Sequence, residues 1–490
     1  ERTTSVSSKV QKSIVTQLST SEATQILLSS DAKATTKVAR SLKISGLGNV
    51  QTPTPAELQK SMQQVKLNIR SKFAKISKSS ISNELNWGSK FKNKWLIASR
   101  DKKLLSPENE NLLSFNFRKY NPAVLHIRFT QAKGKTLNKG MDSFLDITLI
   151  PSEGKVEGKR VEVSTEKFAN ELKKLYKDLS RQNPLNIEDS QSPSRILHKL
   201  LIGNITTLLE KNRITTLLIA ADSGLQAVPF GALHDGKTYF GERYSFSITP
   251  SLALTKLNPS NELEGNRLLA LGASKFEGLT SLPLVPQELE NIGTTKNKDL
   301  FLNKDFTPST LLVTGGDAQY NRIHVATHAE FQPGGPENSV LHTGIGPMPM
   351  SDLSKLRMKR KGAPIDLIIF SACRTALGDP ESELGFSGLA LQAGSRSAIG
   401  TLWYVDDVVT SAYFIQMYKY LDAGIPKAES LQLTRNAFIQ NMITLEGDNV
   451  TGVNGETLIQ GLNSNQKRKF IKGIDNPYFW AGIEVMGSPW

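Results

Sequence analysis

Short apolar runs of strand length recur from about residue 113 onward and alternate with segments of helical length. Buried parallel strands appear in a sequence as continuous apolar runs of about four to eight residues. We therefore predict strands at Leu113–Phe117, Ala123–Phe129, Phe144–Ile150, Thr215–Ala220, Arg267–Gly272, Arg322–Thr327, Asp366–Phe370 and Ser397–Leu402. Strand–helix alternation of this kind favours an α/β fold with a mainly parallel sheet and helices on both faces.

Between these runs, apolar residues recur at helical spacing. The predicted helices are Thr165–Arg181, Pro193–Glu210, Pro286–Gly293, Gly385–Ala393, Asp407–Leu421 and Pro426–Ile443. No apolar run approaches the roughly 18 residues that span a bilayer, so we expect a soluble chain. No repeat of solenoid length is visible.

Basic residues are concentrated at the amino-terminal end. Residues 1–100 hold 17 Lys and Arg against 5 Asp and Glu, whereas the rest of the chain holds 43 against 41. A segment this rich in Ser, Thr and Lys cannot fold by apolar burial alone. We therefore expect residues 1–112 to form a basic arm and residues 113–490 to form the folded body. Residues 1–100 either bind an acidic protein partner or remain solvated.

One part of this arm is predicted to be helical. Thr54, Pro55 and Glu57 provide a capping box with a proline at the first helical position. Apolar residues then recur three and four positions apart, at Leu58, Met62, Val65, Ile69, Phe73 and Ile76. This pattern predicts an amphipathic helix near residues 55–78, whose apolar side packs on the body or on a partner protein rather than on a membrane.

The chain begins at Glu1 without a methionine, and its first residues are rich in Ser and poor in acidic residues. That composition is typical of organelle-targeting peptides. We interpret the sequence as a processed form or as part of a longer chain.

The one cysteine of the chain, Cys373, comes soon after the apolar run Asp366–Phe370, and His328 directly follows Arg322–Thr327. Adjacent parallel strands bring their carboxyl ends to one edge of a sheet, where α/β proteins place their chemistry. A thiol and an imidazole that meet there form a nucleophile–base pair, because the imidazole accepts the thiol proton. The alternative is that Cys373 is a small buried apolar residue.

Two other patterns are weaker. His324 and His328 have the spacing of zinc ligands on a helix, but that spacing loses its meaning in a strand, so we predict no metal site and a packed His324. Gly231–Thr238 matches the phosphate-binding pattern GxxxxGK[ST]. The residues after it are aromatic and unlike a helix start, and Asp235-Gly236 predicts a hairpin turn. We therefore expect no nucleotide or other cofactor.

Six segments carry a family resemblance: Leu225–Leu233, Val325–Phe331, Phe370–Gly378, Glu383–Leu389, Gly400–Val405 and Asn476–Gly482. In this order they resemble the CHAT family of caspase-like cysteine peptidases, in the form found in cyanobacterial members. The likeness runs from about Tyr120 to the last residue and is strongest after residue 215. It implies a caspase-like fold, with residues 113–212 as the amino-terminal part and 213–490 as the catalytic-type core.

The resemblance also implies roles for single residues. Cys373 would attack a peptide carbonyl, His328 would act as base, and the backbone N–H groups of Ala329 and Cys373 would form the oxyanion hole. Caspase-like enzymes generally place glycine after the histidine, so Ala329 would be strained if that position needs a positive φ. Asp406 and Asp407, just after a predicted strand, line a pocket for a basic substrate side chain or, alternatively, cap a helix.

Two functions remain open. The first is a cysteine endopeptidase with a protein or peptide substrate. The second is a catalytically silent, peptidase-like scaffold or linker whose basic arm docks on acidic proteins of a large assembly. By analogy, phycobilisome subunits in a plastid or cyanobacterial cell would be such partners. Nucleic-acid binding is disfavoured, because the arm lacks clustered aromatic residues for base stacking.

Overall fold

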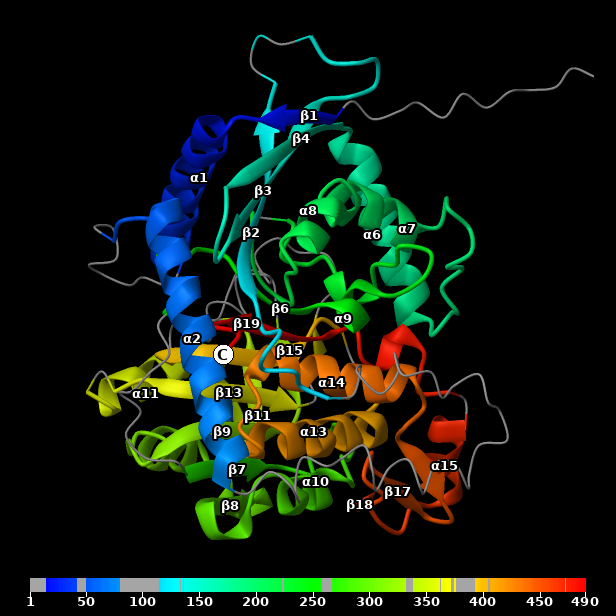
Figure 1. Ribbon diagram of the computed structural model, residues 1–490. Coiled ribbons are helices and arrows are strands. Elements are labelled where there is room, and N and C mark those ends of the chain that lie inside the picture. The colour runs from blue at the N-terminus through cyan, green and yellow to red at the C-terminus, as the bar shows by residue number, and fades with distance from the viewer. Residues whose placement is uncertain are drawn as a thin grey trace, which may run out of the picture.

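The computed structural model describes residues 15–41, 50–79, 114–132, 134, 136–222, 224–257, 267–331, 338–361, 363–371, 374–375, 393–403, 406–471 and 473–490. Among these residues, a twelve-stranded sheet extends through the molecule (Figure 1). Its strands, in spatial order, are β1 (Val15–Leu18), β4 (Glu157–Val163), β3 (Ser143–Pro151), β2 (Pro122–Gln131), β5 (Thr216–Ala221), β6 (Ser245–Thr249), β19 (Ile483–Gly487), β15 (Ser395–Thr401), β13 (Ile365–Ser371), β9 (Tyr320–Ala326), β7 (Arg267–Gly272) and β8 (Lys298–Leu302).

The sheet is mixed but mostly parallel. Strands β2, β5, β6 and β19 form one parallel set, and β15, β13, β9, β7 and β8 form another. The two sets meet where β19 pairs with β15 in antiparallel fashion, and β1, β4 and β3 add antiparallel partners beyond β2. The predicted α/β fold class is confirmed.

Helices cover both faces of this sheet. Along β2, Val124 packs in one core cluster with residues of α1 (Thr20–Ser41) and α2 (Pro55–Ser79). Its neighbours Ala123 and Leu125 point to the opposite face, where they pack with residues of the helices after β4. Besides α1 and α2, the described α-helices are α6 (Thr165–Ser180), α7 (Pro193–His198), α8 (Thr206–Lys211), α9 (Phe240–Arg243), α10 (Val285–Asn291), α11 (Ser354–Lys359), α13 (Asp407–Asp422), α14 (Lys427–Ile439) and α15 (Ser464–Ile471).

Two small sheets complete the described fold. One contains β12 (Gly346–Pro349), β11 (Val340–Thr343), β10 (Ala329–Phe331) and β14 (Arg374–Thr375), and the other contains β16 (Thr444–Glu446), β17 (Asn449–Thr451) and β18 (Thr457–Ile459). The first of them continues from the ends of β9 and β13, which is where the sequence places the candidate dyad.

Most of the predicted strands are present. Strands β2, β3, β5, β7, β9, β13 and β15 lie within two residues of their predicted bounds. The prediction at Leu113–Phe117 is wrong for its described part, because residues 114–117 form no strand. The rings of Phe115 and Phe117 pack on Phe73 of α2 instead, at centroid distances of 4.9 and 6.0 Å.

The helix predictions need two corrections. The single helix predicted at Pro193–Glu210 is broken into α7, a π-helical stretch at Lys199–Gly203, and α8. The helix predicted at Gly385–Ala393 lies outside the described residues except for Ala393, which is in a turn.

The described amino-terminal residues are part of the layered body. Strand β1 pairs with β4, and α2 begins at Pro55 as the capping box predicts, with Thr54 and Glu57 bonded to each other. Leu58 and Met62 of α2 are fully buried against the sheet. The apolar side of the amphipathic helix therefore packs on the body, which was one of the two outcomes expected for it.

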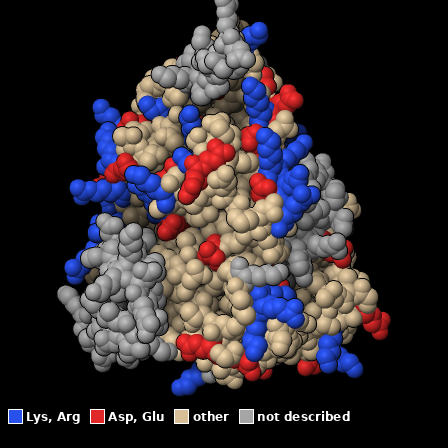
Figure 2. Space-filling view, turned by 90° about the vertical axis from the view of Figure 1, so that its right-hand side faces the viewer, with Lys and Arg blue, Asp and Glu red and all other residues tan. Residues whose placement is uncertain are grey.

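On the side that includes α7 and α15, Lys and Arg gather in several groups with Asp and Glu between them (Figure 2). This face therefore presents charges of both signs. Among the described residues, no helix combines the length and apolarity needed to cross a bilayer.

Candidate active site

His328 lies two residues beyond the end of β9 and is half-buried. Its Nε2 is 2.7 Å from the carbonyl oxygen of Thr280, and its ring packs on Phe276 at a centroid distance of 4.8 Å. A carbonyl oxygen can only accept, so Nε2 carries the hydrogen. In the neutral ring, Nδ1 is then the unprotonated nitrogen that can accept a proton.

The strand that precedes the cysteine lies beside the strand that precedes this histidine. β9 and β13 are parallel neighbours, and their last residues, Ala326 and Ser371, are paired. Thr327 donates its backbone N–H to the carbonyl oxygen of Ser371 at 3.2 Å. The backbone at Ser371, just before the cysteine segment, therefore lies beside the backbone at Thr327, just before His328.

The same two segments meet again on the far side. β10 and β14 are parallel neighbours, with Glu330 opposite Arg374 and Phe331 opposite Thr375. Residues on both sides of His328 are therefore paired with residues on both sides of positions 372–373. Cys373 itself lies outside the described residues, and so does the geometry of its thiol.

Ala329 is buried and begins β10, where it pairs with Leu341 of β11. It is not among the described non-glycine residues that have a positive φ. The left-handed strain that the sequence raised for an alanine at this position does not arise.

Asp406 has a structural role. It is the N-cap of α13, and its side chain accepts hydrogen bonds from the backbone N–H groups of Val408 and Val409. Lys469 of α15 forms ion pairs with both Asp406 and Asp407. Burial and the neighbouring Asp406 raise the pKa of Asp407. The helix cap predicted for Asp406 is therefore confirmed.

His324 is fully enclosed in the core, as predicted. Its Nε2 is 2.8 Å from Oε1 of Glu288, and Ser411 donates to the other oxygen of that carboxylate at 2.6 Å. The rings of Phe414 and Tyr418 pack on the imidazole with centroids 5.5 Å away. His324 thus contributes to packing between β9, α10 and α13.

The segment that matches the phosphate-binding pattern is a turn. Asp235 accepts hydrogen bonds from the backbone N–H groups of Lys237 and Thr238, Gly236 has a φ of 103°, and His234 bridges to Tyr239. The predicted hairpin turn is confirmed. A helix does follow, contrary to expectation: α9 begins at Phe240, but it is only one turn long. The segment begins in a 3₁₀ turn at Phe230–Ala232 and does not directly follow a strand.

Sequence reasoning missed the carbonyl group of Thr280, which fixes the tautomer of His328. No signal in the sequence could have revealed it, because every residue supplies a backbone carbonyl. Only the path of the chain before α10 brings this one to the imidazole.

The family model of the CHAT domain matches residues 191–488, which is more than half of the chain. Separase from Saccharomyces cerevisiae, in its complex with securin, is 11% identical with a TM-score of 0.44, over 96% of this chain and 37% of the separase chain. The protein therefore spans little more than a third of separase's length.

RgpB from Porphyromonas gingivalis, in the complex of its pro- and mature domains, is 10% identical with a TM-score of 0.34, over 66% of this chain and 77% of that one. The structure of the Arg-specific cysteine proteinase gingipain R is 11% identical with the same TM-score, over 66% and 75%. A comparison with curated proteins gives no match. On its family model, the chain belongs to the CHAT-domain family, which is related to the caspase-like cysteine peptidases.

Proposed function

We propose that the protein is a cysteine endopeptidase in which Cys373 is the nucleophile and His328 is the base. One observation carries the proposal: β9 pairs with β13 before the two residues, and β10 pairs with β14 after them. Because the flanking residues are paired before and after these positions, the segment that carries His328 and the segment that carries Cys373 are neighbours in the fold.

The state of His328 suits this role. Because Nε2 donates to the carbonyl oxygen of Thr280, Nδ1 is the nitrogen that takes the thiol proton. The thiolate then attacks the carbonyl carbon of the scissile peptide bond, and the electron pair of the C=O bond moves to the oxygen. When the tetrahedral intermediate collapses, the imidazolium returns its proton to the leaving amine, and water later hydrolyses the thioester.

We assign the oxyanion hole to the backbone N–H groups of Ala329 and Cys373. The backbone of Ala329 supports this assignment, because alanine adopts it without a positive φ. By contrast, Asp406 and Asp407 already hold Lys469, which favours a structural role over contact with a basic substrate side chain.

The test compares Cys373→Ala and Cys373→Ser with the unmodified protein on a peptide library, and measures alkylation by iodoacetamide against pH. We expect cleavage to be lost in both variants. Alkylation of Cys373 should be slower in a His328→Ala variant, because the base that generates the thiolate is missing. His342→Gln serves as the control, since His342 also lies near Phe276 but belongs to β11. Equal cleavage with and without the thiol would end the proposal.

A second function is favoured by the outer surface of α1 and α2. These helices pack Leu27, Leu58 and Met62 on the sheet, and their outer side exposes four lysines, Lys33, Lys37, Lys60 and Lys75. We propose that this basic surface docks an acidic protein. Such docking is compatible with a scaffold and with an active peptidase.

Polyglutamate is a suitable probe for that surface. Lys33→Glu combined with Lys37→Glu should weaken its binding at low salt at least tenfold, whereas Lys173→Glu on α6 should have little effect. Binding that does not depend on salt, or that the double variant leaves unchanged, would exclude docking by charge.

A further inference from the structure

A loop between β7 and α10 contacts the side chain of His328. The loop is closed at its base, because Leu282 donates its backbone N–H to the carbonyl oxygen of Ser274 at 3.0 Å. Ser274 donates its own backbone N–H, at 2.8 Å, and its hydroxyl group, at 3.1 Å, to Oδ1 of Asn303. Residues 275–281 therefore form a loop whose two ends are held together beside the candidate base.

Two groups of this loop contact the imidazole of His328. The carbonyl oxygen of Thr280 accepts the hydrogen bond from Nε2. The ring of Phe276 packs on the imidazole with a centroid distance of 4.8 Å and an angle of 54° between the two planes. The centroid of the His342 ring is 6.4 Å from the same phenyl ring. Of these two histidines, His328 is therefore the one that Phe276 contacts more closely.

One hydrogen bond does not fix the orientation of an imidazole. A histidine side chain turns about two bonds, and the second of these torsions has a broad range of allowed angles. The hydrogen bond to Thr280 holds the Nε2 end of the His328 ring, and the ring can still turn about that contact. A phenyl ring packed on the imidazole restricts this rotation, because a turned ring would collide with it.

The position of Phe276 is itself held by the interior of the protein. Its side chain is half-buried and packs against both of the two largest hydrophobic clusters among the described residues. Its neighbours Lys275 and Glu277 are exposed. Burial of an aromatic side chain contributes strongly to core packing. Phe276 therefore connects the packed interior to the imidazole of His328.

We propose that Phe276 is a positioning residue for peptide cleavage. It acts through His328, by keeping the imidazole in the orientation in which Nε2 donates to Thr280 and Nδ1 is available to the thiol of Cys373. The inference rests on the proposed function, because it takes His328 as the base. The alternative is that Phe276 contributes only to stability, and the two roles predict different results.

The kinetic test uses three variants of Phe276 in the full chain. A catalytic group displaced by about 1 Å can cost about 10²-fold in rate. Phe276→Ala should therefore lower the kcat for peptide cleavage at least tenfold and leave KM nearly unchanged, because the ring acts on His328 and not on the substrate. Phe276→Tyr keeps the ring and should retain most of the activity. Phe276→Leu keeps apolar volume without a flat ring and should lie between the two.

A second readout needs no substrate. The chain has six histidines, and ¹⁵N NMR of histidine-labelled protein distinguishes protonated from unprotonated ring nitrogens. The spectra are recorded at about pH 8.5, above the ordinary imidazole pKa, and His328→Gln identifies the signals of His328. In the unmodified protein, those signals should show the tautomer with hydrogen on Nε2. In Phe276→Ala the two nitrogen signals should move toward each other, because the turning ring leaves the carbonyl of Thr280 part of the time.

Phe129→Ala is the matched control, because Phe129 of β2 is also half-buried, packs against the largest cluster and contacts an aromatic ring, that of Phe168, at 5.3 Å. It should lower the melting temperature and leave both kcat and the His328 signals unchanged.

The inference is overturned if Phe276→Ala leaves the His328 signals as they are, or if its kcat falls only as far as its folded fraction falls. If the unmodified protein cleaves no peptide, the proposed function fails, and the ¹⁵N signals still decide whether Phe276 holds the imidazole.

Discussion

Two histidines of the same strand region, His324 inside the sheet and His328 beyond the end of β9, have similar bonding but different access. Each places Nε2 within hydrogen-bond distance of an oxygen, Glu288 Oε1 for His324 and the carbonyl oxygen of Thr280 for His328. His324 is 0% exposed, and its Nδ1 has no partner among the described residues, whereas His328 is half-buried. Access rather than hydrogen bonding therefore separates a packing histidine from a candidate base.

The sharpest test of this comparison is His328→Gln. Removing a general base typically costs about 10²–10⁴-fold in rate, so the kcat/KM for peptide cleavage should fall by that factor. The melting temperature should hardly change, because the side chain is only half-buried. A loss of activity that merely follows a loss of folded protein would remove His328 from the mechanism.

A substitution at the buried partner of His324 should lower the stability of the protein instead. Glu288→Ala leaves His324 and Ser411 without the carboxylate that both contact. Each buried polar group that is left without a partner costs about 1–3 kcal/mol, and we expect a loss of at least that size in urea unfolding. Glu290→Ala, an exposed neighbour on α10, should cost little. If the two variants are equally stable, the interior contact contributes nothing.

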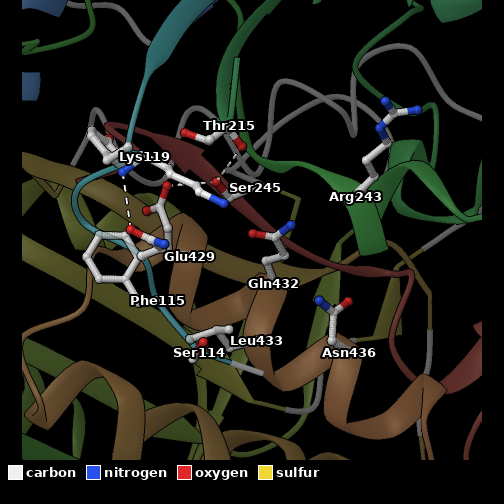
Figure 3. A pocket seen from close by; sticks show the side chains of 12 residues that line it. Ser114, Phe115, Lys119, Thr215, Arg243, Ser245, Glu429, Gln432, Leu433 and Asn436 are labelled. Carbon is white, nitrogen blue, oxygen red and sulfur yellow. Dashed lines mark hydrogen bonds between the residues drawn. The ribbon is translucent and has the colours of Figure 1, made fainter. Parts of the chain in front are cut away.

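Glu429 of α14 extends the comparison to a buried carboxyl group, which accepts hydrogen bonds from the hydroxyl groups of Thr216 and Ser245; Figure 3 shows it beside Ser245. Its folded-state pKa of about 7 lies above its ordinary value of 4.5, so the stabilisation linked to its proton is present below pH 4.5 and is lost as pH rises through 7. Relative to Glu429→Gln, the free energy of unfolding should fall by about 2–3 kcal/mol between pH 4.5 and about pH 8. Parallel pH profiles of the two proteins would contradict the raised pKa.

The smallest effect is expected at Asp406, which follows a strand of the sheet but caps a helix. Asp406→Ala should destabilise the protein by about 1 kcal/mol, because α13 loses its N-cap, and Asp406→Asn should lose less since the amide oxygen still caps. Neither variant should change the preference for basic residues in a cleaved peptide library. A selective loss of basic substrates would reassign Asp406 to the substrate pocket.

Much of this architecture is readable from apolar runs. The strands β5, β13 and β15 are buried on both faces and have few charged residues, so they stand out in the sequence. Strand β4 was missed because Glu157–Val163 mixes half-buried polar residues with buried apolar ones, as is common in an antiparallel pair, where it lies between β1 and β3. The short β1 was also missed, since three of its four residues are exposed.

One part of the candidate site was predictable from the sequence and another part was not. His328 and the pairing of its strand with β13 follow from the predicted strand ends, because neighbouring strands bring them together. The carbonyl of Thr280 and the contacts of the buried Glu429 with Thr216 and Ser245 could not be predicted. Both depend on which distant segments the fold brings together, and neither requires a recognisable motif.

The place of β19 has a consequence for how the chain assembles. This strand is the last one along the chain, yet it stands between β6 and β15 in the middle of the sheet. The two parallel sets gain their common border only after residues 483–487 have left the ribosome, and the long sequence separation from β6 slows that closure. Until then β6 and β15 have open edges that other chains could extend, and only the insertion of β19 closes both of them.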